Sequence, residues 1–162
     1  MRPNRLAVPQ SKSQSFDLRH EVVPYFANPW HFHPEIELNY VISGNGTRFI
    51  GQNTDRFSSG EIIRLGKNLP NYWKSDLTTT LQNGIQSEAI VARFTEDFTG
   101  KGFFFLPETR DISHLFEKAC YGLILTEPLK SQVAQDLRGL IQQKGFDQLF
   151  YLIQILYKIG RR

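Results

Sequence analysis

The sequence predicts a mainly β domain, most of it a barrel of short strands, followed by about three α-helices. Between about Phe16 and Thr95, β-branched and aromatic runs are broken at close intervals by turn residues, which is typical of short strands. Beyond Pro107, apolar residues recur at helical spacing. A chain of 162 residues is long enough to bury a core without disulfides. We therefore expect a flexible polar arm over residues 1–15, a barrel over 16–106 and a helical segment over 107–162.

The clearest strand covers Glu35 to Ile42, where apolar and polar side chains alternate. Successive residues of a strand point to opposite faces, so the two sets separate. The apolar face comprises Ile36, Leu38, Tyr40 and Ile42. The opposite face carries Glu35, Glu37 and Asn39. This polar face is either solvated, as in many half-buried strands, or turned into the barrel while the apolar face lies beneath the helices.

Turn residues place the other strands. Between Ser43 and Gly46, two glycines and Asn45 tolerate positive φ, which predicts a hairpin. Further strands are expected at residues 47–51, 61–65 and 87–94.

Three helices are expected after the barrel. The first contains Ile112 and Leu115, the second follows Thr126, and the third covers Phe146 to Ile159. The third helix is apolar nearly all round, so it must pack against the other helices, against a second subunit or against sequence outside these 162 residues, and we expect a combination of these. The residues expected at a homodimer interface are Leu137, Leu140, Ile141, Leu149, Ile153 and Leu156.

The composition narrows the class of protein. Cys120 is the only cysteine, which excludes an intrachain disulfide and a cysteine-rich zinc site and favours a reducing compartment. No signal-peptide pattern and no run of about 20 apolar residues occurs, so we expect a cytoplasmic protein without membrane contact. The net charge is +3, and the dispersed Lys and Arg residues form no stripe for nucleic acid.

One short segment carries residues with metal-binding chemistry. His31 and His33 are two residues apart, Glu37 lies four further on, and Gly44 follows. In extended chain, residues of equal parity share a face, so the two imidazoles and the carboxylate converge. Such a set is typical of first-row transition-metal sites and of the facial triad of non-haem iron enzymes.

These residues resemble the first cupin motif, which predicts a cupin, or jelly-roll, β-barrel. In the second cupin motif a histidine completes the metal site. The matching position here, just after Leu69-Pro70, is occupied by Asn71. An amide oxygen is a poor ligand for zinc, iron, copper or nickel compared with imidazole, so we expect no metal and no other cofactor. A metal-dependent cupin enzyme, an oxygenase or isomerase using His31, His33 and Glu37, is the alternative.

A second resemblance covers the whole chain. The segments His33–Leu38, Gly44–Gly51 and Leu65–Pro70, with the three helices, are similar to the N-terminal sensor domain of AraC-family transcriptional regulators. The resemblance implies a non-catalytic barrel that binds a small effector, a sugar or a small organic acid, and helices that form a homodimer. It also implies DNA contact only through a helix-turn-helix domain, which these 162 residues do not contain.

Pockets combine aromatic walls with a few polar anchors, which selects the candidate ligand-binding residues. They are His31, His33, Glu37, Asn39, Arg48, Asn71 and Trp73. A dimerisation module whose pocket no longer binds anything is the remaining hypothesis.

Overall fold

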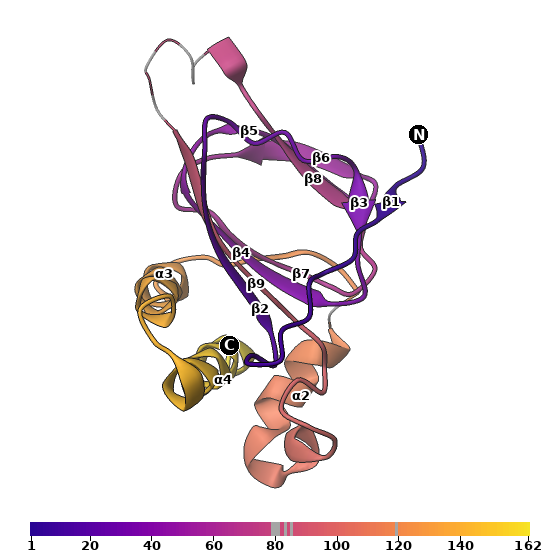
Figure 1. Cartoon of the computed structure of the whole chain (residues 1–162), viewed down its shortest axis with the longest axis vertical. Helices are drawn as coiled ribbons and strands as arrows, with labels where there is room; N and C mark the ends of the chain where they lie inside the picture. Colours follow the sequence, from indigo (N-terminus) through magenta and orange to yellow (C-terminus); the bar gives the residue numbers. More distant parts are fainter. Residues whose placement is uncertain (79–81, 83, 85, 119) are drawn as a thin grey trace.

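The computed structural model describes residues 1–78, 82, 84, 86–118 and 120–162. Two five-stranded sheets face each other and enclose a barrel, and the helices lie against the outer side of one sheet (Figure 1). The prediction of a mainly β barrel followed by three C-terminal helices is confirmed.

The strands form two sheets, and the helices form a separate layer. The first sheet has the order β1-β3-β8-β5-β6, with bounds Asn4–Arg5, His31–Phe32, Asn71–Ser75, Gly46–Ile50 and Asn53–Phe57. The second has the order β10-β7-β4-β9-β2, with bounds Leu123–Ile124, Ile62–Leu65, Ile36–Ser43, Ser87–Phe94 and Asp17–Val23. The 3-10 turns η1 and η2 cover Phe103–Phe105 and Pro107–Thr109, and α2, α3 and α4 cover Arg110–Glu117, Leu129–Leu140 and Gly145–Gly160.

Strand β4 lies at the centre of the second sheet and is antiparallel to β7 on one side and β9 on the other. Its residues Ile36, Leu38 and Tyr40 belong to one apolar core with residues of all three α-helices. Glu37 and Asn39, on the opposite face, line the interior of the barrel. Of the two arrangements that the alternating pattern allows, the protein adopts the one with the polar face inside.

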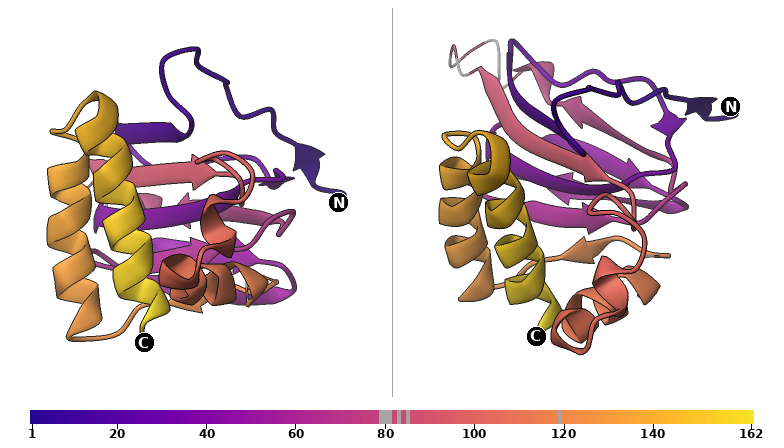
Figure 2. Two further views of the ribbon diagram at one scale, coloured as in Figure 1. Left: turned by 90° about the horizontal axis from the view of Figure 1, so that it is seen from below. Right: turned by 60° about the horizontal axis from the view of Figure 1, so that its bottom comes forward.

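Helices α3 and α4 run side by side across the outer face of the second sheet (Figure 2). Leu137, Leu140 and Leu156 are at most 1% exposed and pack in this layer. The prediction that these three side chains contact a second subunit is therefore wrong, because burial within one chain leaves them no surface to offer. The other three predicted interface residues, Ile141, Leu149 and Ile153, are partly buried against the same core.

The N-terminal segment, expected to be a mobile arm, is tied to the barrel. Strand β1 pairs in parallel with β3, and the N–H of Asn4 donates to the carbonyl of Trp30 at 3.0 Å. Farther along, Gln14 Nε2 donates to Gln148 Oε1 of α4 at 2.9 Å. Edge strands carry free backbone groups that an extended segment pairs with easily. For this reason β1 and β10 extend the sheets beyond the range 16–106 expected for the barrel.

None of the helices that the structure describes has both the length and the hydrophobicity needed to cross a membrane.

Gly46, which has no side chain, allows strand β5 to approach β8 closely. A Cβ atom at this position would lie 2.1 Å from the backbone carbonyl oxygen of Lys74. Because backbone must move to admit a methyl group, we expect Gly46→Ala to lower the free energy of unfolding by about 2–3 kcal/mol in urea titrations. Gly122→Ala, whose Cβ meets only side-chain atoms at 3.5 Å or more, is the control. If both variants lost similar amounts of unfolding free energy, the close approach of β5 to β8 would not be the cause of the loss.

Candidate ligand-binding site

A small cavity lies inside the barrel, between the two sheets. Five of the residues predicted to bind a ligand line it, namely His31, Glu37, Asn39, Asn71 and Trp73. Its volume is about 20 Å³, which is room for about one water molecule. In this conformation, side chains therefore fill most of the barrel interior.

Strand register brings these side chains together. His31 on β3 lies opposite Asn71 on β8, and Trp73 is two residues farther along the same strand. Glu37 and Asn39 are likewise two apart on β4, in the facing sheet. Alternate residues of a strand share a face, so each sheet presents polar groups to the other across the interior.

Glu37 is the charged centre of the cavity and is 1% exposed. Arg93 Nε of β9 donates to Glu37 Oε2 at 2.9 Å, and Asn39 Nδ2 donates to Oε1 at 3.1 Å. His33 Nε2 lies 3.0 Å from Oε2. Burial alone would raise the pKa of Glu37, but the hydrogen bond with His33 and the charge of Arg93 outweigh it and lower the pKa to about 2. Glu37 is thus ionised at neutral pH and paired within the barrel.

Four side chains around the cavity each keep one buried polar atom that has no hydrogen-bond partner among the described residues. The exposed fractions are 5% for His31, 8% for Asn39, 1% for Asn71 and 3% for Trp73. The unpartnered atoms are His31 Nε2, Asn39 Oδ1, Asn71 Oδ1 and Trp73 Nε1. An unpaired buried polar group costs about 1–3 kcal/mol. Four such groups around one cavity are what a site for a polar molecule requires.

The same residues do not fit a metal centre. The carboxylate of Glu37 is engaged by His33 and by Arg93, whose positive charge already balances that of the carboxylate and repels a cation. Asn71 stands where the completing histidine of a cupin metal site would be. Within the described part of the chain, no group of three His, Cys, Asp or Glu side chains is arranged to hold a metal ion.

Two of the predicted ligand-binding residues are not part of the cavity lining. His33 contacts Glu37 and also has Nδ1 3.1 Å from the carbonyl oxygen of Glu35. Arg48 is buried elsewhere in the barrel, with Nε 3.0 Å from Glu61 Oε1. Arg48 borders a separate groove of about 630 Å³. Its pairing with Glu61, which no local pattern reveals, keeps it away from the cavity.

Arg93 is a site residue that the sequence prediction omitted. It lies near the end of β9, where the preceding four residues, 89–92, are all apolar. A single charge in an apolar strand is a signal, because buried charges are almost always paired. The partner, Glu37, is 56 residues away and is identified only by the pairing of β4 with β9.

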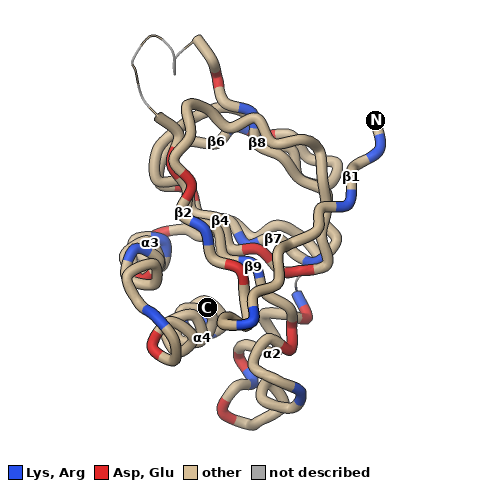
Figure 3. The backbone as a smooth tube through the Cα atoms, in the orientation of Figure 1, with Lys and Arg blue, Asp and Glu red and all other residues tan. Residues whose placement is uncertain are grey.

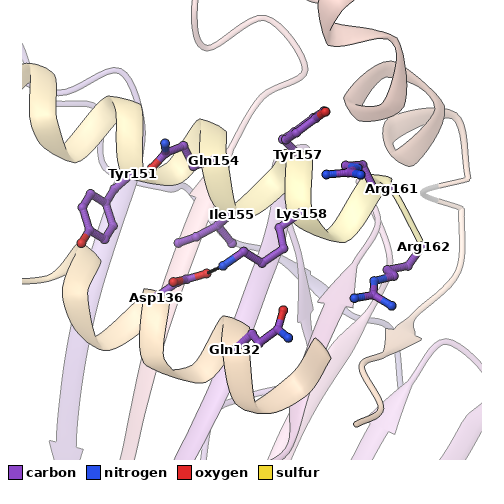
Figure 4. A pocket seen from close by; sticks show the side chains of 9 residues that line it. All are labelled: Gln132, Asp136, Tyr151, Gln154, Ile155, Tyr157, Lys158, Arg161 and Arg162. Carbon is purple, nitrogen blue, oxygen red and sulfur yellow. Dashed lines mark hydrogen bonds and ion pairs between the residues drawn. The ribbon is translucent and has the colours of Figure 1, made fainter. Parts of the chain in front are cut away.

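A larger groove of about 670 Å³ lies between α3 and α4, outside the barrel. Lys158 and Asp136 form an ion pair across it, and Arg161 and Arg162 lie at its end (Figure 4). None of the buried unpartnered atoms of the described residues lies in this groove. Lys and Arg residues are spread over both sheets and the helices (Figure 3). The barrel cavity is therefore the better candidate for a binding site.

The fold is similar to that of known transcriptional regulators. The crystal structure of the AraC-like transcriptional activator CuxR matches 93% of this chain with a TM-score of 0.58 and 10% sequence identity, over 52% of its own length. An apo ToxT variant from Vibrio cholerae matches 98% of the chain with a TM-score of 0.55 and 10% identity, over 56% of its own length. Wild-type ToxT bound to an unsaturated fatty acid matches 98% of the chain with a TM-score of 0.53 and 12% identity, over 53% of its own length.

These likenesses establish the fold. The chain spans about half the length of the regulators that it matches. No family model matches the sequence, and no curated protein matches it.

The ionised Glu37 predicts how stability depends on pH. Its pKa is about 2 in the folded protein and close to the ordinary 4.5 in the unfolded chain, so the unfolded state binds the proton first as pH falls. The stabilisation is complete above about pH 4.5 and is lost toward pH 2, with a total on the order of 3 kcal/mol. Urea unfolding at a series of pH values measures this loss.

Glu37→Gln should remove that part of the pH dependence, because the variant has no proton to gain at this position. Glu96→Gln is the control, since Glu96 is exposed and pairs only with Lys67 among the described residues; it should keep the full dependence. If Glu37→Gln and the wild type lose stability in parallel between pH 5 and 3, Glu37 is not the group responsible.

Proposed function

We propose that this chain is the small-molecule sensing and dimerisation domain of an AraC-type bacterial transcriptional regulator, acting in the cytoplasm. The observation that carries the proposal is the cluster of unpartnered buried polar atoms around one cavity of the barrel. The fold, similar to about half of CuxR and of ToxT, supports the regulatory context. A ToxT structure bound to an unsaturated fatty acid supports small-molecule binding by proteins of this fold.

Binding accounts for the cavity better than catalysis does. Metal-assisted chemistry would need Glu37 as a free ligand, yet both of its oxygens accept hydrogen bonds, and Arg93 balances its charge. The side chains that remain unsatisfied, those of His31, Asn71 and Trp73 among them, hold single donors or acceptors suited to recognition. The cavity volume is about 20 Å³, so a ligand of more than a few heavy atoms requires side chains to move.

A thermal-shift screen against metabolites of several classes tests the sensing role. A ligand present at 100 times its Kd stabilises the native state by about 2.7 kcal/mol, which raises the midpoint of unfolding by roughly 5 °C or more. We expect at least one class of metabolite to give such a shift. Asn71→Ala should abolish the shift, and Asn53→Ala, at an exposed position on β6, should preserve it.

Two results of this experiment would overturn the proposal. If no metabolite class changes the unfolding midpoint, the pocket is vestigial and the chain is only a dimerisation module. If the purified protein instead contains stoichiometric iron, zinc or manganese that is lost in His31→Ala, the metal-dependent enzyme replaces the sensor.

The outer face of α4 supports a dimer through three exposed aromatic residues that the predicted interface did not include. Phe146, Phe150 and Tyr157 are 75%, 48% and 41% exposed, and the first two rings stack with centroids 6.1 Å apart. Their spacing of four and seven residues, with partly buried Ile153 between, places them on one stripe of the helix. Such a stripe is typical of the seam between two packed helices. A second copy of α4 is the proposed occupant.

Phe150→Glu should convert a dimer to a monomer, because it places a charge in the centre of the apolar stripe. Analytical ultracentrifugation at tens of micromolar measures the mass. Phe105→Glu is the matched control, since Phe105 is 90% exposed but lies on η1, away from α4, and it should leave the dimer intact. A wild-type monomer at this concentration would contradict the dimer.

A further inference from the structure

The hydrogen bond that His31 makes with the backbone indicates which of its ring nitrogens carries a proton. His31 Nδ1 lies 2.7 Å from the carbonyl oxygen of Pro29. A carbonyl oxygen only accepts hydrogen bonds, so Nδ1 carries the proton. In the tautomer with the proton on Nδ1, the ring presents Nε2, the unpartnered atom, to the cavity as an acceptor.

The orientation of both asparagines is determined in the same way. Asn39 Nδ2 donates to the carboxylate of Glu37 at 3.1 Å, and Asn71 Nδ2 donates to the carbonyl oxygen of Leu69 at 2.9 Å. Turning either amide over would place its oxygen against an oxygen that cannot donate. The unpartnered Oδ1 atoms are therefore acceptors as well.

Trp73 adds a single donor, because the indole nitrogen carries a hydrogen and accepts nothing. Among the buried unpartnered side-chain atoms of the described residues around the cavity, three are thus acceptors and one is a donor. Its charged lining consists of Glu21, Glu37 and Arg93. Two carboxylates therefore face one guanidinium, which also lies 3.4 Å from Asp17. Both the excess of acceptors over donors and the excess of negative charge disfavour binding of an anion.

We propose that this cavity selects a small, non-anionic molecule that is rich in N–H or O–H donors. Such a ligand satisfies the acceptors of His31, Asn39 and Asn71 and accepts one hydrogen bond from Trp73. A carboxylate brings only acceptors and leaves the three acceptors unpaired beside Glu37. The inference rests on the proposed sensing function and deepens it, because it favours a hydroxyl- or amide-bearing effector over an organic acid.

Pairs of probes that differ in one group test this selectivity with a change in size of at most one heavy atom. Acetamide and acetate form the smallest pair, glycerol and glycerate the next, and glucose and glucuronate the largest. The protein contains two tryptophans, so its ¹⁵N-labelled form shows two indole N–H signals, which Trp73→Phe assigns. The Trp30 signal is the internal control, because its ring contacts Tyr72, which alternates to the opposite face of β8.

We expect acetamide and glycerol to shift the Trp73 signal and not the Trp30 signal, with affinities at least about tenfold tighter than those of acetate and glycerate. Asn71→Leu should weaken acetamide binding at least about fivefold, and Asn53→Leu should leave it unchanged. Because Asn71→Leu also frees the carbonyl of Leu69, Trp73→Phe provides a second variant, which removes the indole N–H and keeps an aromatic ring at this position. Acetamide binding to Trp73→Phe, followed on the backbone signals of β8, should be weaker than to the wild type.

Two outcomes overturn the inference while sensing still stands. One is acetate or glycerate binding as tightly as its neutral partner at Trp73. The other is an anionic metabolite from the thermal-shift screen that shifts the Trp73 signal while no neutral probe does. If neither the screen nor the probes give binding, the proposed function fails together with the inference.

Discussion

The rest of the structure depends on the buried ion pair between Glu37 and Arg93. Both residues lie inside the barrel, on adjacent strands whose register places them opposite each other. Each charge would be very costly to bury alone, and removal of one partner from such a pair typically costs about 3–5 kcal/mol. The pair therefore keeps the polar face of β4 inside the barrel. The apolar face of β4 must then point outward, where helices cover it.

Strand β4 consequently joins the cavity to the helical layer. Glu37 and Asn39 face the barrel cavity, whereas Leu38 and Tyr40, their neighbours in sequence, pack beneath the helices. The hydroxyl of Tyr40 also accepts a hydrogen bond from Arg138 of α3 at 3.1 Å. A shift of β4 caused by a bound molecule would therefore act directly on the layer whose outer surface is the proposed dimer face.

The cupin-like motif has a different role here from the one that its residue types suggest. The ionised carboxylate of Glu37 forms an ion pair with Arg93 and a hydrogen bond with His33. Asn71 supplies an amide at the position where a histidine would complete a metal site. Of the motif residues, only His31 keeps a free ring nitrogen facing the cavity. A motif that defines a fold thus need not preserve its metal chemistry, because ligand quality depends on what surrounds each side chain.

The sequence alone determined the elements that depend on local periodicity: the strand at residues 87–94, the alternation along β4 and the three helices. Five of the seven residues predicted to bind a ligand lie around the cavity, and their binding role stays a prediction. Only the tertiary structure decided which face of β4 is inside, that Arg93 belongs to the site and Arg48 does not, and that Leu137 and Leu156 are core residues. Periodicity depends only on a few neighbouring residues. Arg93 and Glu37 are 56 positions apart, and their pairing depends on the strand register between distant segments.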